Sequence, residues 1–270
     1  PAYSLQPYKK LPLGSNRLNL CIDTFILGKP SHWLEDELEK QAPPDEIWVS
    51  CHMTFNNELV HETIRAAKRI FPKAIILLGG NYATLFPQEA EQKSGATVFK
   101  GLFPGAAELF PDYSLFRGHL DYMVFQLDLG CNNNCSHCVN SLLHQEIVRM
   151  DVPSLVEDLK RKKEQYGVSC FVNIDPNVAC FDLTDFLQTC INRKLNASLY
   201  FYGGIQPDKV TPRLAALMYE AGVRGLTLPR ELETASNLKL KKTYSPAHFY
   251  DSVKVFQQAS FDLSDFHCSF

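Results

Sequence analysis

Short apolar runs alternate with longer amphipathic segments along the whole chain. The short runs are rich in Val, Ile, Leu and Phe, whereas the longer segments repeat their apolar positions at the helical period. Because parallel strands need a long crossover, an alternation of this kind predicts parallel sheets with helices between consecutive strands. The sequence therefore predicts an α/β fold.

Residues 1–101 contain four of these expected strands. The pattern places them at Leu18–Ile22, Glu46–Ser50, Ala74–Gly79 and Ala96–Lys100. Helices are expected over residues 31–41, 57–71 and 87–93, and Ser31 followed by acidic residues is typical of a helix start. We predict a small doubly wound, Rossmann-like domain, whose ligand site should lie at the carboxyl ends of its strands.

A second α/β domain is expected over residues 121–270. Its strands are predicted at Tyr122–Leu129, Cys170–Ile174, Ser198–Tyr202, Gly225–Leu228 and Asp265–Phe270. Helices are predicted over residues 153–166, 183–193, 209–222 and 246–259. This repeat indicates a partial (β/α) TIM-like barrel, and residues 102–120, which lack a sustained period, are predicted to be the linker.

Three cysteines cluster in a polar loop after the first predicted strand of the barrel. Cys131, Cys135 and Cys138 lie within Asp128–Val139, which is rich in Gly and Asn. Three thiolates at this spacing can hold three corners of an iron–sulfur cube. The fourth iron would then lack a protein ligand and be open to a small molecule.

Clustered cysteines can also form a zinc site or a disulfide framework. A Cys3His zinc site could recruit His137 or His144, but structural zinc sites more often use two CxxC pairs. A disulfide framework suits small secreted domains, and the nine cysteines of this 270-residue chain show no paired spacing. The six cysteines outside the loop are expected to be inert core residues.

Composition excludes several classes of function. A net charge of −3 argues against nucleic-acid binding, and no apolar run is long enough to cross a membrane. The N-terminus lacks a signal-peptide pattern. We therefore expect a cytoplasmic protein with no nucleic-acid or membrane partner.

The CxxxCxxC spacing resembles the signature of the radical S-adenosylmethionine (SAM) enzymes. The resemblance implies a [4Fe-4S] cluster on Cys131, Cys135 and Cys138 that binds SAM through its open iron. Reductive cleavage of SAM would then give a 5′-deoxyadenosyl radical. An electron donor such as flavodoxin or ferredoxin would be required, and His137 would pack close to the SAM adenine.

The turn after the third expected strand, Gly79-Gly80-Asn81 followed by Ala-Thr and Pro87, resembles the cobalamin-binding domain of one radical SAM class. Physical reasoning alone explains the glycines equally well as a strand-to-helix turn. The sequence has no Asp-x-His-x-x-Gly motif. If cobalamin binds, the lower face of its cobalt is therefore expected to lack a histidine ligand.

Two further strand ends are candidates for SAM contacts. Asp175, at the end of the second barrel strand, could pair with the SAM ammonium group, or could simply form an Asx-Pro turn. The segment Leu228–Ser236 resembles a SAM-supporting segment of the family. There Arg230 could bind the SAM carboxylate and Glu231 or Glu233 could assist, unless these charges only begin a solvated helix.

The resemblance implies methyl transfer to an unactivated carbon or to phosphorus of a small molecule or peptide. Two alternatives stay open. One is a cobalamin-independent radical SAM reaction by hydrogen abstraction or rearrangement, and the other is a non-catalytic binding module in which the metal only stabilises the cysteine loop. Barrels of this family usually have six strand–helix units, and about five are predicted here, so a truncated barrel is expected. The substrate and the oligomeric state are not specified by the sequence.

Overall fold

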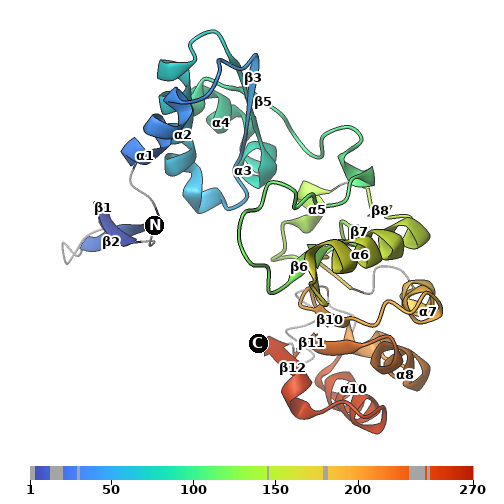
Figure 1. Cartoon of the computed structure of the whole chain (residues 1–270). Coiled ribbons are helices and arrows are strands. Elements are labelled where there is room, and N and C mark those ends of the chain that lie inside the picture. Colours follow the sequence, from blue (N-terminus) through green and yellow to red (C-terminus); the bar gives the residue numbers. More distant parts are fainter. Residues whose placement is uncertain are drawn as a thin grey trace. The chain divides into compact units, whose positions relative to one another are not determined.

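The chain forms two compact units, Pro1–Gly101 and Leu102–Phe270 (Figure 1). The computed structural model describes residues 4–12, 21–28, 31–144, 146–178, 182–230, 241 and 244–269. Both units contain parallel sheets with helices between the strands, so the predicted α/β class is confirmed.

The first unit is built on a three-stranded parallel sheet in sequential order. Its strands are β3 (Glu46–Ser50), β4 (Ile75–Gly79) and β5 (Thr97–Val98). Its helices are α1 (Ser31–Glu39), α2 (Asn57–Ile70), α3 (Gly80–Leu85) and α4 (Pro87–Ser94). Ile76 and Leu78 of the central strand pack with Ile64 of α2, so one face of the sheet is buried under helices.

The strand predicted at Leu18–Ile22 is described only from Cys21 onward, because residues 18–20 fall outside the described ranges. Cys21 and Ile22 begin strand β2 (Cys21–Gly28), which pairs antiparallel with β1 (Ser4–Pro12) in a separate two-stranded sheet, so the predicted parallel pairing is wrong for them. The connection between them is shorter than the dozen or so residues that a parallel crossover needs, so an antiparallel pair is the outcome that the chain allows.

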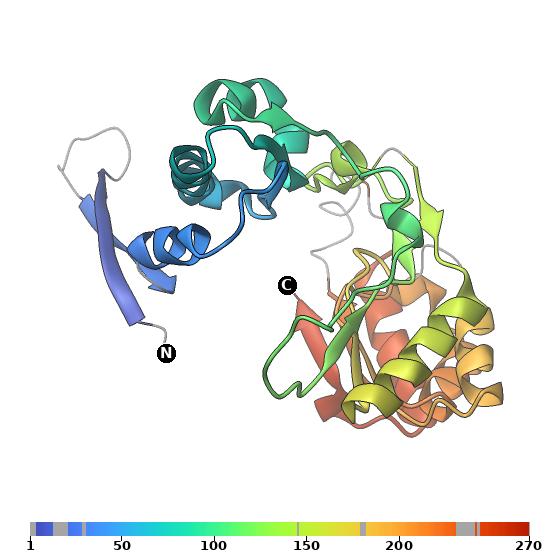
Figure 2. The same cartoon turned by 45° about the horizontal axis from the view of Figure 1, so that its top comes forward.

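The second unit holds a five-stranded, entirely parallel sheet with strands in sequential order. The strands are β6 (Met123–Phe125), β9 (Cys170–Asn173), β10 (Ser198–Phe201), β11 (Val223–Pro229) and β12 (Phe266–Ser269). The helices are α6 (Val152–Tyr166), α7 (Thr184–Asn192), α8 (Pro212–Glu220) and α10 (Pro246–Gln258). They lie along one side of the sheet (Figure 2).

Side chains alternate between the two faces of this sheet. Phe125 and Phe201 are buried on the helix-covered face, where Phe125 stacks on Phe186 of α7 with ring centroids 5.5 Å apart. Tyr200 points to the other face, because side chains alternate along a strand, and its ring lies 6.1 Å from that of Tyr202. The open face therefore carries aromatic residues close to the strand ends.

The strand predicted at Tyr122–Leu129 is interrupted. It forms β6 and then a short strand β7 (Asp128–Leu129), which pairs antiparallel with β8 (Val148–Arg149). The break occurs because the backbone N–H groups of Leu127 and Asp128 donate to the Asp175 carboxylate instead of to a neighbouring strand.

Residues of the predicted linker 102–120 pack against the second unit. Phe110, Tyr113 and Leu120 contact its hydrophobic core. The Tyr113 hydroxyl also accepts a hydrogen bond of 2.8 Å from the backbone N–H of Val124 in β6. This segment thus supports the strand that leads to the cysteine loop.

Candidate metal and cofactor site

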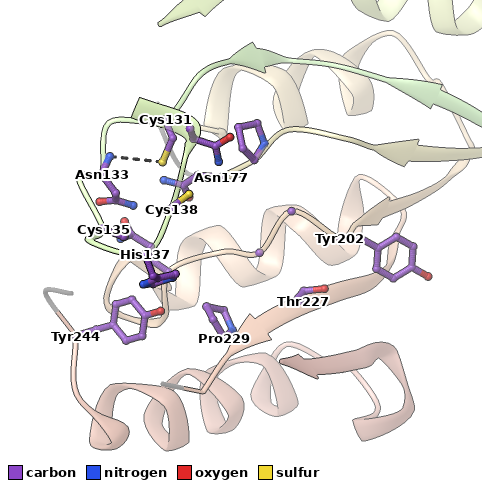
Figure 3. A pocket seen from close by; sticks show the side chains of 15 residues that line it. Cys131, Asn133, Cys135, His137, Cys138, Asn177, Tyr202, Thr227, Pro229 and Tyr244 are labelled. Atoms are coloured by element: carbon purple, nitrogen blue, oxygen red, sulfur yellow. Dashed lines mark hydrogen bonds between the residues drawn. The ribbon is translucent and has the colours of Figure 1, made fainter. Parts of the chain in front are cut away.

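A cavity of about 750 Å³ lies at the carboxyl ends of β9, β10 and β11, beside the cysteine loop (Figure 3). This is the edge of a parallel sheet where loops meet and ligands bind. Its described lining residues are Cys131, Asn133, Cys135, His137, Cys138, Asn140, Pro176, Asn177, Tyr202, Gly203, Gly204, Gln206, Thr227, Pro229 and Tyr244.

All three loop cysteines line this cavity. Cys135 is buried, with 9% of its surface exposed, and Cys131 and Cys138 are half-buried. The backbone N–H of Asn133 donates to the Cys131 sulfur at 3.5 Å, and Cys138 N–H donates to the Cys135 carbonyl at 3.1 Å. Hydrogen bonds to sulfur stabilise a thiolate, which is the form that binds iron.

The thiols border a cavity rather than surrounding one point. In the described part of the chain, no three His, Cys, Asp or Glu side chains are close enough to hold a metal ion. A zinc ion needs all its ligands about 2.0–2.3 Å from one centre, whereas an iron–sulfur cube takes its three thiolates at separate corners. The chemistry of the donor set therefore fits a cluster better than the Cys3His zinc alternative.

Asp175 is buried and is not among the described residues that line the cavity. Only 1% of its surface is exposed, and its two carboxylate oxygens accept the N–H groups of Leu127 and Asp128 at 2.9 and 3.0 Å. Burial raises the pKa of Asp175 to about 7, although these hydrogen bonds oppose the shift. Asp175, which the sequence predicted to contact SAM, thus connects the segment after β9 to the backbone just before the cysteine loop.

Asp128 is a second buried carboxylate next to Asp175. None of its surface is exposed, and neither oxygen has a hydrogen-bond partner among the described residues. Arg149 brings its Nε to 3.9 Å from Oδ1. Burial raises the pKa of Asp128 to about 6, and the Arg149 charge only partly offsets it.

The loop after β9 also supports the cysteine loop from the cavity side. Asn177, which is 4% exposed, donates its Nδ2 to Asn132 Oδ1 at 3.4 Å. The adjacent loop after β10 packs so closely that a Cβ on Gly203 would overlap the Asp175 carbonyl oxygen. Only glycine fits there, so these strand ends form one tightly packed support for the cysteines.

The remaining predicted SAM contacts are placed differently. His137 is exposed and lines the cavity. Arg230 does not line it and lies against α10, where Nη2 is 3.4 Å from the Tyr250 hydroxyl and the guanidinium stands 5.9 Å from that ring. Glu231 and Glu233 fall outside the described residues.

In the first unit, Gly79, Gly80 and Asn81 form the turn from β4 into α3. Gly80 has φ +88°, and a Cβ there would stand 2.7 Å from the Cys51 carbonyl oxygen, so this position requires glycine. Gly79 has no such constraint, because its Cβ would meet only the Phe99 carbonyl oxygen at 4.0 Å. The structure thus explains one of the two glycines by backbone geometry.

Sequence reasoning did not single out several cavity residues, among them Tyr202, Thr227 and Tyr244. Thr227 is a polar residue between leucines in a buried strand, which is a signal that the sequence offered. Tyr244 follows a charged stretch far along the chain, so only the fold brings it to the cysteines.

Known proteins resemble this chain both in the sequence of its first unit and in its fold. Residues 22–110 match the family described as B12 binding domain. No curated protein sequence matches the chain. No helix in the described ranges is both long and apolar enough to span a bilayer.

Two solved structures of the radical SAM methyltransferase TsrM from Kitasatospora setae share the fold. One contains tryptophan substrate and the SAM analogue aza-SAM, and the other contains cobalamin and a [4Fe-4S] cluster. Each superposes with a TM-score of 0.68 at 15% identity over 86% of this chain. The chain spans 58% and 59% of their lengths, respectively.

The predicted resemblance is thus supported at the level of domain and fold. Residues 22–110 match a B12 binding domain, and the chain shares its fold with the two TsrM structures.

Proposed function

We propose that this protein is a radical SAM enzyme that holds a [4Fe-4S] cluster on Cys131, Cys135 and Cys138. The observation that carries the proposal is the position of these thiols, which border a cavity of about 750 Å³ at the carboxyl end of a parallel barrel sheet. When bound, the cluster would pass an electron to the sulfonium of SAM and cleave a carbon–sulfur bond. Cobalamin would serve as the methyl carrier.

The protein's own residues would position these groups. Asn133 N–H would stabilise the Cys131 thiolate, while Asp175 and Asn177 hold the segment from Leu127 to Asn132 at the start of the loop. His137 and Tyr244 line the cavity and offer rings for the adenine to pack on.

We further propose methyl transfer to an unactivated carbon or to phosphorus of a small molecule or peptide. The B12 binding domain match and the two TsrM structures, one solved with a tryptophan substrate, support this choice. A flavodoxin- or ferredoxin-type donor would supply the electrons, and a cytoplasmic location would suit the reduced thiols. A cobalamin-independent radical SAM reaction is the alternative.

SAM cleavage tests the enzyme. The protein reconstituted with iron and sulfide should release 5′-deoxyadenosine from SAM under dithionite, measured by mass spectrometry. Cys135→Ala should abolish this, whereas Cys170→Ala, which removes a half-buried lone thiol of β9, should retain it. A stable cluster with no turnover of SAM would support the non-catalytic module instead.

Cobalt content tests the cofactor separately. After reconstitution with hydroxocobalamin and gel filtration, we expect about one cobalt per chain and a cobalamin absorption band. A cobalt content near zero with an intact cluster would leave the cobalamin-independent reaction.

A further inference from the structure

The cavity extends well beyond the cysteine loop. Figure 3 shows the thiols at one end, Tyr202 at the other, and Thr227 between them, with its hydroxyl on the Tyr202 side. The volume of about 750 Å³ is in the upper half of the range of about 300–1,000 Å³ that is usual for ligand pockets. The Tyr202 end of the cavity therefore lies apart from the thiols.

The described residues that line this cavity include no acidic side chain, lysine or arginine. A charged group buried there would lose its hydration without gaining a partner, which costs several kcal/mol. The described walls thus favour an uncharged group.

Thr227 offers a free hydrogen-bonding group at this end. It is 6% exposed, it lines the cavity, and its Oγ1 has no hydrogen-bond partner within the described ranges. Buried hydroxyls are normally paired. The backbone N–H of Ile205, which follows β10, donates to the Thr227 carbonyl at 3.0 Å and not to the hydroxyl.

An aromatic side chain lines the same end of the cavity. Tyr202 is 52% exposed, and Tyr200 stacks on it with ring centroids 6.1 Å apart and an angle of 25° between the rings. A planar group placed against Tyr202 would extend this stack, since aromatic rings prefer centroid distances of about 4.5–7 Å.

We propose that Tyr202 and Thr227 form the substrate end of the cavity and bind an uncharged aromatic group that carries a hydrogen-bonding atom. The inference deepens the proposed function, because it assigns the cysteine end to the cluster and SAM and the Tyr202 end to the group to be modified. Tyr202 supplies the stacking surface, and Thr227 Oγ1 selects for the polar atom.

Four small probes separate the chemical classes. Phenylacetamide, phenylacetate, phenethylamine and cyclohexylacetamide would be titrated into the reconstituted protein, with and without SAM, and followed by saturation-transfer NMR. We expect phenylacetamide to bind best and the two charged probes to bind at least about tenfold more weakly. Equal binding of the charged probes would overturn the proposal, as would no binding of phenylacetamide.

Matched variants locate the binding. Thr227→Val keeps the shape but removes the hydroxyl, and should weaken phenylacetamide binding about three- to tenfold. Thr227→Ser should bind as the unmodified protein does. Tyr202→Leu should weaken binding, whereas Tyr122→Leu, which changes a similarly exposed tyrosine outside the cavity, should not.

Unchanged phenylacetamide binding in both Thr227→Val and Tyr202→Leu would contradict the assignment. An equal loss of affinity in Thr227→Val and Thr227→Ser would show that Thr227 contributes by packing and not by a hydrogen bond from its hydroxyl. The electron paramagnetic resonance (EPR) response of the cluster to SAM is recorded on the same samples. Its absence would refute the proposed function, while the probe titrations without SAM would still decide whether the Tyr202 end binds its ligand.

Discussion

The two units place their candidate sites at the same structural position but support them differently. In both, the site follows the carboxyl ends of parallel strands. In the first unit the Gly79–Gly80 turn packs on its neighbouring strand end at Cys51. In the second, Asp175 after β9 accepts two backbone N–H groups just ahead of the cysteine loop, and Gly203 after β10 packs on the Asp175 carbonyl. Both sites thus depend on a neighbouring strand end, but the glycine turn is held by a close backbone approach, whereas the cysteine loop also needs buried hydrogen bonds to a carboxylate.

The largest effect should come from Gly203→Ala. Its Cβ would overlap the Asp175 carbonyl oxygen, so the backbones of both loops must move. We expect the free energy of unfolding to fall by at least about 4 kcal/mol, with loss of iron binding. Gly167→Ala is the control, since its Cβ would meet nothing within 4 Å and only the positive φ of 69° is strained. Equal urea midpoints for the two variants would show that the strand ends are loosely packed.

Asp175→Ala should come next. It leaves the buried N–H groups of Leu127 and Asp128 without their acceptor, and each unpaired group costs about 1–3 kcal/mol. We expect a loss of about 3 kcal/mol and a lower iron content after reconstitution. Asp182→Ala removes an exposed carboxylate that accepts the Thr184 N–H, and should cost less than about 1 kcal/mol. If iron content were unchanged in Asp175→Ala, the carboxylate would not position the cysteine loop.

Gly80→Ala and Gly79→Ala sharpen the comparison within the first unit. At Gly80 the left-handed backbone and the 2.7 Å approach to the Cys51 carbonyl oxygen should cost about 2 kcal/mol. Gly79→Ala should leave stability within about 1 kcal/mol of the parent. If Gly79→Ala nevertheless lowered the cobalt content after hydroxocobalamin treatment, a cofactor would approach that backbone. Loss of stability in Gly79→Ala would remove this distinction and contradict the geometry.

The smallest effect, and one of opposite sign, is expected for Asp128→Asn. Because burial raises the pKa of Asp128 to about 6, the native state favours the protonated form, and stability falls as pH rises from about 4 to 6. Removing the charge should raise the free energy of unfolding by about 1 kcal/mol above pH 6, and should have little effect below pH 4. Urea denaturation of the parent and the variant at pH 4 and pH 7.5 measures the difference in their free energies of unfolding. A variant less stable than the parent at pH 7.5 would show that the Arg149 contact stabilises the Asp128 charge by more than burial destabilises it.

The sequence predicted what depends on periodicity and spacing. Four parallel strands of the second unit and the four helices between the strands lie where the apolar pattern placed them, whereas the first predicted strand is interrupted after Phe125. The cysteines follow that first strand and line the cavity. The sequence mispredicted the pairing of Cys21 and Ile22, because periodicity does not state the pairing direction of a strand. It did not reveal that Asp175 supports the loop or that Thr227 and Tyr244 line the cavity, since these are contacts between segments distant in the chain.

The central claim, a cluster with one open iron, is tested most directly by EPR of the reduced, reconstituted protein with and without SAM. We predict a reduced [4Fe-4S] signal that changes when SAM is added and that is lost in Cys135→Ala but retained in Cys170→Ala. A signal that does not respond to SAM, or the absence of any cluster in correctly folded protein, would contradict the account.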